Sequence, residues 1–335
     1  MQQITPTVSV AVITYNMQQY LTQLLDSILM QKTNFPFEIV VDDDHSPDQS
    51  RTILLDYQRR FPDRIVLSLR DHNVGGSLNM YGVLRQCRGK YIAILEGDDW
   101  WECEDKLQYQ YDFLESHPEY IAMYCNSWVE TSLTETIHHP RRDISSPLVF
   151  TYADYMHSHF FDRLPNSTDT AFFRNFFKDA PEQELDVFYR AHNMVWDQSL
   201  ALILYGKGPV YVDPRLVSHH RSIVVEGGTN YQSLYAKRDN KVSDARMYAC
   251  QEDYIEHILH RRCTQFYKVR GLLFAEAFWI ACKSKSKDDW EKAKEIWNQR
   301  RKKYPLVFWT IAWGWSTFKR RITRVLIRRQ SKNEV

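Results

Sequence analysis

The chain has 335 residues and 44% of them are hydrophobic, so it can bury a large core arranged in one or two domains. Its 43 basic and 42 acidic side chains leave a formal net charge of +1, which argues against a protein that binds polyanions over its whole surface. The six cysteines form no CxxC pair and no zinc-ligand spacing, as is typical of buried thiols in a reducing compartment. Neither a signal peptide nor an apolar run of about 18 residues is found, so the sequence predicts a cytoplasmic globular protein.

The first hundred residues alternate between short apolar runs and amphipathic stretches of helical period. The pattern predicts strands at residues 8–13, 38–41, 64–69 and 91–95, and helices at residues 17–31, from 48 onward and at 79–88. Strands that alternate with helices form right-handed βαβ units. This part of the chain therefore predicts an α/β fold with a mostly parallel sheet flanked by helices.

The strand at residues 91–95 runs directly into three carboxylates, Glu96, Asp98 and Asp99. Side chains at the carboxyl ends of parallel strands gather at one edge of the sheet, where α/β proteins bind their ligands. Crowded oxygen ligands at such a place are typical of a Mg²⁺ or Mn²⁺ site, because the cation offsets their mutual repulsion. The alternative interpretation is a solvated acidic turn. The glycine-rich turn at residues 73–76 matches neither GxGxxG nor a P-loop.

Four segments, in this order, resemble the family 2 inverting glycosyltransferases, which bind a nucleotide sugar on a GT-A fold. The segments are residues 8–16 with a TYN turn, 38–48 (EIVVDDDHSPD, similar to DDxSxD), 73–76 (NVGG, similar to NxG) and 89–100 (GKYIAILEGDDW, similar to GxYIxxLDxDD). Their order and spacing are more specific than any one segment alone. The resemblance implies a GT-A-like domain at residues 1–225, with a donor half at residues 1–118 and an acceptor half at residues 119–225.

The resemblance also implies a donor site at the strand ends. The implied donor-binding residues are Thr14, Tyr15, Asn16, Asp44, Asn73, Gly75, Gly76, Glu96 and Arg221. Tyr15 would offer a stacking face to the nucleoside, and Asp44 would accept a hydrogen bond from the N3–H of a uracil. Asp98 would bind the divalent metal, Mn²⁺ or Mg²⁺, that bridges the donor diphosphate, and Glu96 would hold the ribose or a metal-bound water. Ordinary turn and capping chemistry is the alternative interpretation.

In the acceptor half, Asp197 begins a predicted helix and resembles the family's catalytic base. In that role it would take the proton of the acceptor hydroxyl; the alternative is a carboxylate favoured only by the helix dipole. The family often has a Tyr-Arg pair followed by a metal-binding histidine. Here His220 stands in place of the tyrosine and Ile223 in place of the histidine, so His219 or His220 could act as the metal ligand only if the register shifts. Arg221 fits the arginine of the pair and would bind the diphosphate.

Residues 226–335 are predicted to form a loop, at 226–231, and a helical extension. The loop either closes over bound donor or is a plain surface loop. Aromatic residues followed by basic ones at 304–329 are typical of a helix in an anionic membrane interface, and a helix packed on the domain is the alternative. The composition thus gives the hypothesis of a cytoplasmic protein, peripheral at the inner face of the cell membrane. No nucleic acid is expected as a partner.

These observations favour a metal-dependent inverting glycosyltransferase in bacterial-type surface polysaccharide synthesis. Its expected partners are a nucleotide-sugar donor, in particular a UDP-sugar, and a glycan or lipid-linked acceptor. The lack of a QxxRW motif and of a transmembrane bundle argues against a processive synthase, and the first strand lacks the glycine-rich pattern of a sugar-nucleotide pyrophosphorylase. A non-catalytic nucleotide-sugar-binding or interaction protein of the same fold is the alternative, and the missing metal-binding histidine supports it.

Overall fold

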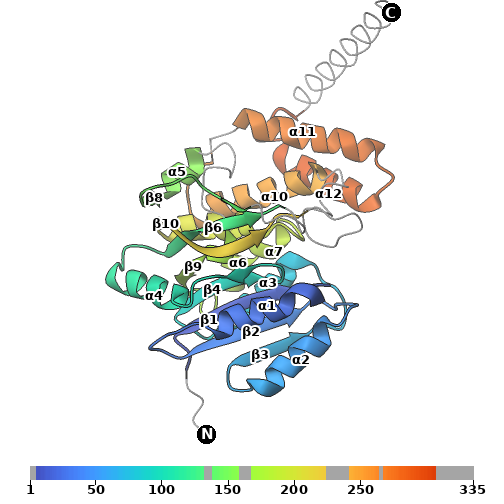
Figure 1. The fold of residues 1–335 in the computed structure, drawn as a ribbon. Coiled ribbons are helices and arrows are strands. Elements are labelled where there is room, and N and C mark those ends of the chain that lie inside the picture. Colours follow the sequence, from blue (N-terminus) through green and yellow to red (C-terminus); the bar gives the residue numbers. More distant parts are fainter. Residues whose placement is uncertain (1–4, 132–137, 158–166, 224–240, 264–266, 307–335) are drawn as a thin grey trace, which may run out of the picture. The chain divides into compact units, whose positions relative to one another are not determined.

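The computed structural model describes residues 5–131, 138–157, 167–223, 241–263 and 267–306 (Figure 1). The chain divides into two compact units, residues 1–238 and 239–335. The expected donor loop at 226–231 and residues 307–329 of the expected membrane-binding segment lie outside the described residues. Both therefore stay predictions from sequence.

The first unit contains the sheet and the helices that cover it. Its strands are β1 (Val8–Thr14), β2 (Phe37–Asp43), β3 (Ile65–Leu69), β4 (Tyr91–Glu96), β5 (Trp100–Trp101), β6 (Ala122–Glu130), β7 (His138–Pro140), β8 (Leu148–Phe150), β9 (Phe172–Arg174) and β10 (Val210–Arg221). Its helices are α1 (Gln18–Leu29), α2 (Ser50–Arg60), α3 (Gly76–Gln86), α4 (Lys106–Ser116), α5 (Tyr152–His157), α6 (Glu182–Leu185), α7 (Val187–Arg190) and α8 (Asp197–Lys207).

One sheet of ten strands runs through this unit in the order β3-β2-β1-β4-β9-β6-β10-β5, with β7 paired to β6 and β8 to β10. The neighbouring strands in the order β3-β2-β1-β4 are all parallel, and β10 is parallel to β6. Strand β9 is antiparallel to both β4 and β6. The predicted α/β fold with a mostly parallel sheet is confirmed.

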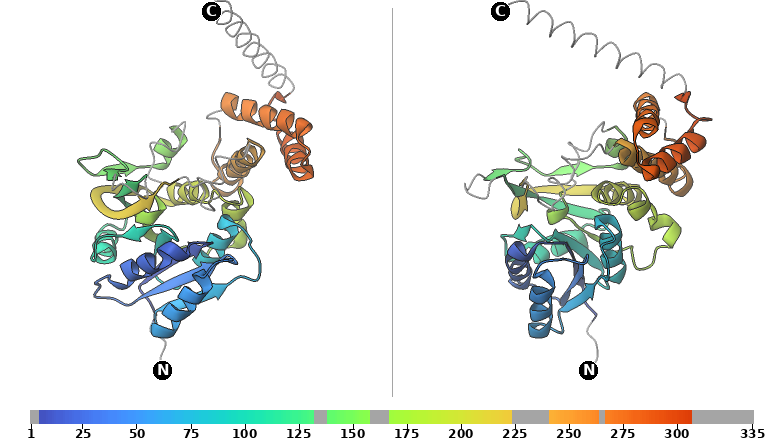
Figure 2. Two further views of the ribbon diagram at one scale, coloured as in Figure 1. Left: turned by 45° about the vertical axis from the view of Figure 1, so that its right-hand side comes forward. Right: turned by 90° about the vertical axis from the view of Figure 1, so that its right-hand side faces the viewer.

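The side chains of β1 point alternately to the two faces of the sheet. Val8, Val10 and Val12 are fully buried in one core together with Leu21 and Leu24 of α1. Helix α3 packs against β1 and β2, and Figure 2 shows α1 and α2 on one side of the sheet and α3 on the other. The apolar side of each helix therefore packs on one face of the sheet. This is expected for a parallel sheet with helices on both faces.

The strand register brings the polar strand ends together. Strand β1 lies between β2 and β4, so Ile13 has Asp42 on one side and Glu96 on the other. The Asp44 N–H donates to the Thr14 carbonyl oxygen at 3.0 Å, which ties the turn after β2 to the end of β1. The predicted convergence of the polar clusters at one sheet edge is confirmed.

Strand β9 follows the alternating βαβ part of the chain and is antiparallel to both of its neighbours. Phe172 and Phe173 are fully buried where β9 inserts between β4 and β6. The insertion carries the 3₁₀ turn Thr168–Thr170 to the end of β4, where Thr168 Oγ1 donates to Glu96 Oε1 at 2.6 Å. A short antiparallel strand thus delivers a hydroxyl to the carboxylate cluster.

The side chain of Lys106 is buried in the first unit. Lys106 at the start of α4 is fully buried, its Nζ donates to Gln110 Oε1 at 2.7 Å, and the ammonium lies 4.2 Å from the centre of the Trp101 ring. No carboxylate forms an ion pair with it among the described residues. Burial accordingly lowers the pKa of the Lys106 ammonium to about 8.

We expect the wild-type protein to gain about 2 to 3 kcal/mol of stability relative to Lys106→Met when the pH is raised from 7 to 10. The folded-state pKa of about 8 lies below the ordinary 10.5, so the buried charge destabilises the fold fully below pH 8 and the cost disappears toward pH 10.5. Urea unfolding of both proteins at the two pH values measures this difference. The exposed Lys32→Met is the control, and an equal pH dependence for Lys106→Met and wild type would contradict the burial effect.

The second unit is helical. It consists of α10 (Lys241–Asp253), a π-helical turn (Tyr254–Ile258), α11 (Tyr267–Lys283) and α12 (Lys287–Arg300). Phe274 and Ile296 belong to the apolar core that these helices share. The fully buried Glu252 accepts a hydrogen bond from Tyr304 at 2.7 Å and pairs with Arg300 at 3.3 Å. Within the described part of the chain, no helix has the length and apolar character needed to cross a bilayer.

Candidate active site

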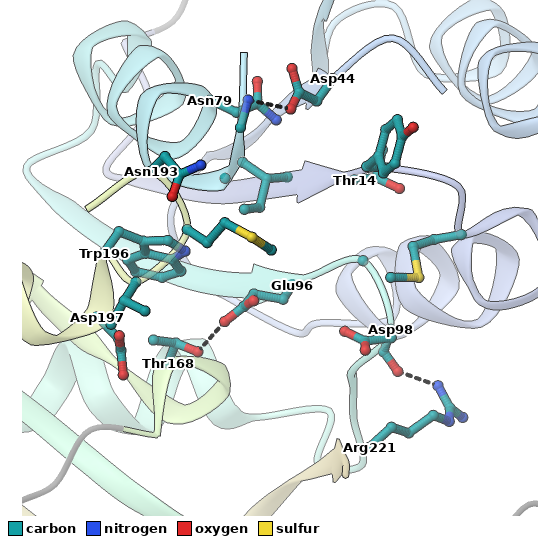
Figure 3. A pocket seen from close by; sticks show the side chains of 18 of the residues that line it. Thr14, Asp44, Asn79, Glu96, Asp98, Thr168, Asn193, Trp196, Asp197 and Arg221 are labelled. Carbon is teal, nitrogen blue, oxygen red and sulfur yellow. Dashed lines mark hydrogen bonds between the residues drawn. The ribbon is translucent and has the colours of Figure 1, made fainter. Parts of the chain in front are cut away.

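A cavity of about 570 Å³ lies at the carboxyl ends of β1 and β4 (Figure 3). The glycine segment 73–76, residues 193–198 at the start of α8 and the end of β10 form its walls. The predicted site residues that line it are Thr14, Tyr15, Asp44, Asn73, Gly75, Gly76, Glu96, Asp98, Asp197 and Arg221. Asn16 lies outside this lining: it takes a φ of 57° and donates its N–H to Ser46 Oγ at 2.9 Å. It therefore shapes the turn that presents Tyr15.

Asp44 organises the end of the cavity expected to take the nucleoside. Its two carboxylate oxygens accept hydrogen bonds from the N–H groups of Val74 at 2.7 Å and Gly75 at 2.9 Å. Asn73 Nδ2 donates to the Asp44 carbonyl oxygen at 3.1 Å. A carboxylate oxygen has lone pairs for more than one donor. Asp44 thus fixes the glycine segment while its side chain still borders the cavity.

The glycine segment docks against a loop that sequence reasoning did not identify, residues 193–196. Gly75 has a φ of +88°, and a Cβ at this position would lie 2.9 Å from the Asn193 carbonyl oxygen. The same oxygen accepts the Ser77 N–H at 3.0 Å. Both the backbone conformation and the close approach require glycine here. The donor-side segment and the loop that leads into Asp197 are therefore one packed structure.

His192 holds that loop from within. Its Nδ1 accepts hydrogen bonds from the N–H groups of Met194 at 3.0 Å and Val195 at 2.9 Å. His192 is buried, and Asp197 follows five residues later at the start of α8. The ring nitrogen therefore fixes the backbone between the glycine segment and Asp197.

We expect His192→Leu to lower the turnover number about 10- to 100-fold, because a loop displaced by about 1 Å misplaces the group that it carries. His192→Asn is expected to keep most of the rate, since Asn Oδ1 takes nearly the position of Nδ1 and accepts the same N–H groups. Nucleoside diphosphate release and thermal stability of both variants are the measurements. A slow Asn variant with Leu-like kinetics would show that ring volume, and not the acceptor atom, matters here.

The carboxylate cluster at the end of β4 is electrostatically crowded. Burial, together with the charges of Asp99 and Asp98, raises the pKa of Glu96, and burial together with Asp99 raises that of Asp98. Asp98 and Glu96 both point into the cavity in Figure 3. Oxygen ligands whose charges repel one another at a half-buried cavity wall fit a hard divalent cation. The donor set thus fits the expected Mg²⁺ or Mn²⁺.

Asp99 is not part of the cavity lining and belongs to a second group of ligand atoms. Its carboxylate accepts from the Arg221 N–H at 2.9 Å and lies 3.0 Å from His220 Nδ1. The ligand atoms of Asp99, Asp169 and His220 all lie within 4.8 Å of one another, so this group also has the composition of a cation site. Asp169 is fully buried, and the sequence analysis did not include it among the candidate ligands. The carboxylate of Asp99 acts against the effect of burial and raises the pKa of His220.

Arg221 was predicted to pair with the donor diphosphate, and the structure places its guanidinium among protein acceptors. Nε lies 3.1 Å from Glu130 Oε2, one terminal nitrogen donates to Gln23 Oε1 at 2.7 Å, and the other donates to the Asp98 carbonyl oxygen. The guanidinium also lies over the Tyr20 ring at 4.6 Å. This arrangement braces the loop that carries Asp98.

Asp197 is the first residue of α8 and lines the cavity. Trp196 occupies the N-cap position, and no side chain caps the helix. Burial raises the pKa of the Asp197 carboxyl, while backbone N–H groups at the helix start act in the opposite direction. In Figure 3 Asp197 and Glu96 approach the same cavity from α8 and β4. A half-buried carboxylate with a raised pKa that lines a cavity has the properties of a general base.

Comparison with known proteins gives consistent matches. The family model "Glycosyl transferase family 2" matches residues 9–180. "Uncharacterized protein Rv1520" of Mycobacterium tuberculosis is 39% identical over 111 residues, which are 33% of this chain and 32% of that protein. The "Putative teichuronic acid biosynthesis glycosyltransferase TuaG" of Bacillus subtilis is 33% identical over 109 residues, 32% of this chain and 42% of TuaG. The chain thus spans less than half the length of each of these relatives.

The sheet and its covering helices also match solved structures. The Staphylococcus aureus TarS 1–349 structure in complex with UDP superposes with a TM-score of 0.54 at 18% identity, covering 81% of this chain and 70% of that one. The TarS 1–349 structure in complex with UDP-GlcNAc gives a TM-score of 0.53 at 16% identity, covering 89% and 92%. At such identities the likeness shows the fold, and the GT-A type predicted from sequence is confirmed.

Proposed function

The chain belongs to glycosyl transferase family 2, and from this premise we propose that it transfers a sugar from a UDP-sugar to a glycan or lipid-linked acceptor, with inversion and with a divalent metal. One observation carries the proposal. Tyr15 and Asp44 at the strand-end turns, the carboxylate of Asp98 and the half-buried carboxylate of Asp197 line a single cavity. An inverting transfer needs these parts, and needs them within reach of one donor molecule.

In the proposed reaction, Asp197 takes the proton of the acceptor hydroxyl as its oxygen attacks the anomeric carbon. The new oxygen–carbon bond forms on the face opposite the leaving diphosphate, whose bond to the anomeric carbon breaks, so the configuration inverts. Tyr15 and Asp44 orient the nucleoside, and Thr168 holds Glu96 in place. A Mg²⁺ or Mn²⁺ held by Asp98, with Glu96 beside it, would supply positive charge near the departing diphosphate.

The relatives support the proposed substrate classes. TuaG is described as a putative teichuronic acid biosynthesis enzyme, and Staphylococcus aureus TarS, 36% identical over 96 residues that are 28% of this chain and 16% of TarS, as a poly(ribitol-phosphate) beta-N-acetylglucosaminyltransferase. These names favour an acceptor among cell-surface polymers. The TarS structures with UDP and UDP-GlcNAc favour a UDP-sugar donor. Peripheral attachment to the inner face of the membrane is part of the proposal and rests on the composition of residues 304–329.

The test is release of nucleoside diphosphate from a panel of UDP-, GDP- and dTDP-sugars with Mn²⁺, Mg²⁺ or EDTA, with donor binding titrated in the same samples. We expect metal-dependent binding of one UDP-sugar and its slow hydrolysis without acceptor. Binding of a GDP- or dTDP-sugar alone would overturn the UDP assignment. Donor binding without turnover on any acceptor extract would favour the non-catalytic alternative.

A further inference from the structure

The cavity is lined by three basic side chains, Arg141, His220 and Arg221, which differ in what they already contact. His220 lies against Asp99, and the Arg221 guanidinium is bound to protein acceptors around the Asp98 loop. The structure shows no hydrogen bond or ion pair for the Arg141 side chain within its described residues. Arg141 is therefore the basic lining residue whose donors remain available to a ligand.

The backbone around Arg141 is fixed. The Arg141 N–H donates to the Ser127 carbonyl oxygen at 2.8 Å. The neighbouring Arg142 donates its N–H to Asn126 Oδ1 at 3.1 Å and accepts from Asn126 Nδ2 at 2.9 Å. Asn126 and Ser127 are buried in β6. A side chain that projects from an anchored backbone loses less entropy when it binds a ligand.

Several negatively charged side chains line the cavity, and Arg141 can offset their charge. Asp44, Glu96, Asp98 and Asp197 all line the same space, so an anionic ligand would meet mainly carboxylates there. The Arg141 charge reaches the reacting side of the cavity: burial raises the pKa of Asp197, and Arg141 partly opposes that rise. A guanidinium can bind two phosphate oxygens at once, which suits it to balance this repulsion.

We propose that Arg141 forms a subsite for a phosphate group in this cavity, a role that sequence analysis had given to Arg221. The inference rests on the proposed function, and the phosphate has two sources there: the diphosphate of the donor or a phosphate carried by the acceptor. The chemistry is the same for both, namely a phosphate oxyanion bound by the guanidinium next to the carboxylates of the cavity.

Calorimetric titration in the presence of Mg²⁺ tests the subsite with UDP against uridine, with inorganic pyrophosphate, and with glycerol 3-phosphate against glycerol. Arg141→Gln is expected to weaken binding of the phosphate probes by about 10- to 100-fold and to leave uridine unchanged. Arg141→Lys should recover part of the affinity, because the charge remains and the two-pronged geometry is lost. Arg59→Gln removes the same charge from the exposed face of α2 and serves as the control.

If Arg141→Gln weakens the binding of UDP and pyrophosphate and leaves the binding of glycerol 3-phosphate unchanged, the subsite belongs to the donor. The reverse pattern assigns it to the acceptor. If Arg141→Gln binds every phosphate probe within about twofold of wild type, or wild type binds none of them, the subsite is refuted. The wild-type protein could also bind glycerol 3-phosphate through Arg141 and bind no nucleotide. That result would refute the proposed UDP-sugar donor and would still support the phosphate subsite.

Discussion

Asp197→Asn is expected to lower the turnover number by about 100- to 10,000-fold while the affinity for the donor changes by less than about twofold. Asparagine has the shape of aspartate and keeps the start of α8, but it cannot take a proton from the acceptor hydroxyl. Transfer rate and donor affinity, measured on the same preparation, separate the two effects. The matched control is Asp154→Asn, which removes a carboxylate from the first turn of another helix, α5, outside the cavity lining.

The pH dependence of the wild-type enzyme gives an independent readout of the same residue. Burial raises the pKa of Asp197 above its usual value, and a carboxylate can act as a general base only when ionised. The value of kcat/KM should therefore rise with pH through this raised pKa and level off above it. A near-normal rate for Asp197→Asn would mean that the residue serves only the helix dipole, the alternative drawn from sequence.

The half of the site that follows β1, β2 and β4 was predictable because it is encoded locally. Apolar runs and helical periods fix the βαβ order, and parallel neighbours must place their carboxyl ends at one edge. Asp44, Glu96 and Asp98 needed no further information to be grouped, since each lies at the end of its strand or in the turn that follows it.

The rest of the site depends on contacts between distant segments, which local patterns do not encode. Asn193 contacts Gly75 although the two lie far apart in the sequence, and Thr168 reaches Glu96 because β9 pairs antiparallel with β4. The sequence showed that Arg221 is basic and near the expected place, but not that Glu130 and Gln23 occupy its donors. The partners that a side chain contacts are set by tertiary structure. A motif therefore predicts where a residue lies better than it predicts the role of that residue.

Asp98→Asn is expected to lower kcat/KM for the donor by about 100- to 1000-fold, because the charge that builds on the departing diphosphate loses its neutralising cation. Thermal stability should stay equal or rise, since burial and Asp99 already oppose ionisation of Asp98 and the substitution removes one of the crowded charges. Stability measured beside activity thus excludes unfolding as the cause of the loss.

Binding of Mn²⁺, followed by its paramagnetic resonance spectrum, then decides between the two groups of ligand atoms at this strand end. If the ion is held at the cavity, Asp98→Asn abolishes donor-enhanced Mn²⁺ binding, and Asp99→Asn weakens it only through the loop that Asp99 holds by its contacts with His220 and Arg221. If the ion instead lies among Asp99, Asp169 and His220, the order of the two variants is reversed. In that case the cation would lie in a group of which only His220 lines the cavity, and Asp98 would remain free to contact the donor directly.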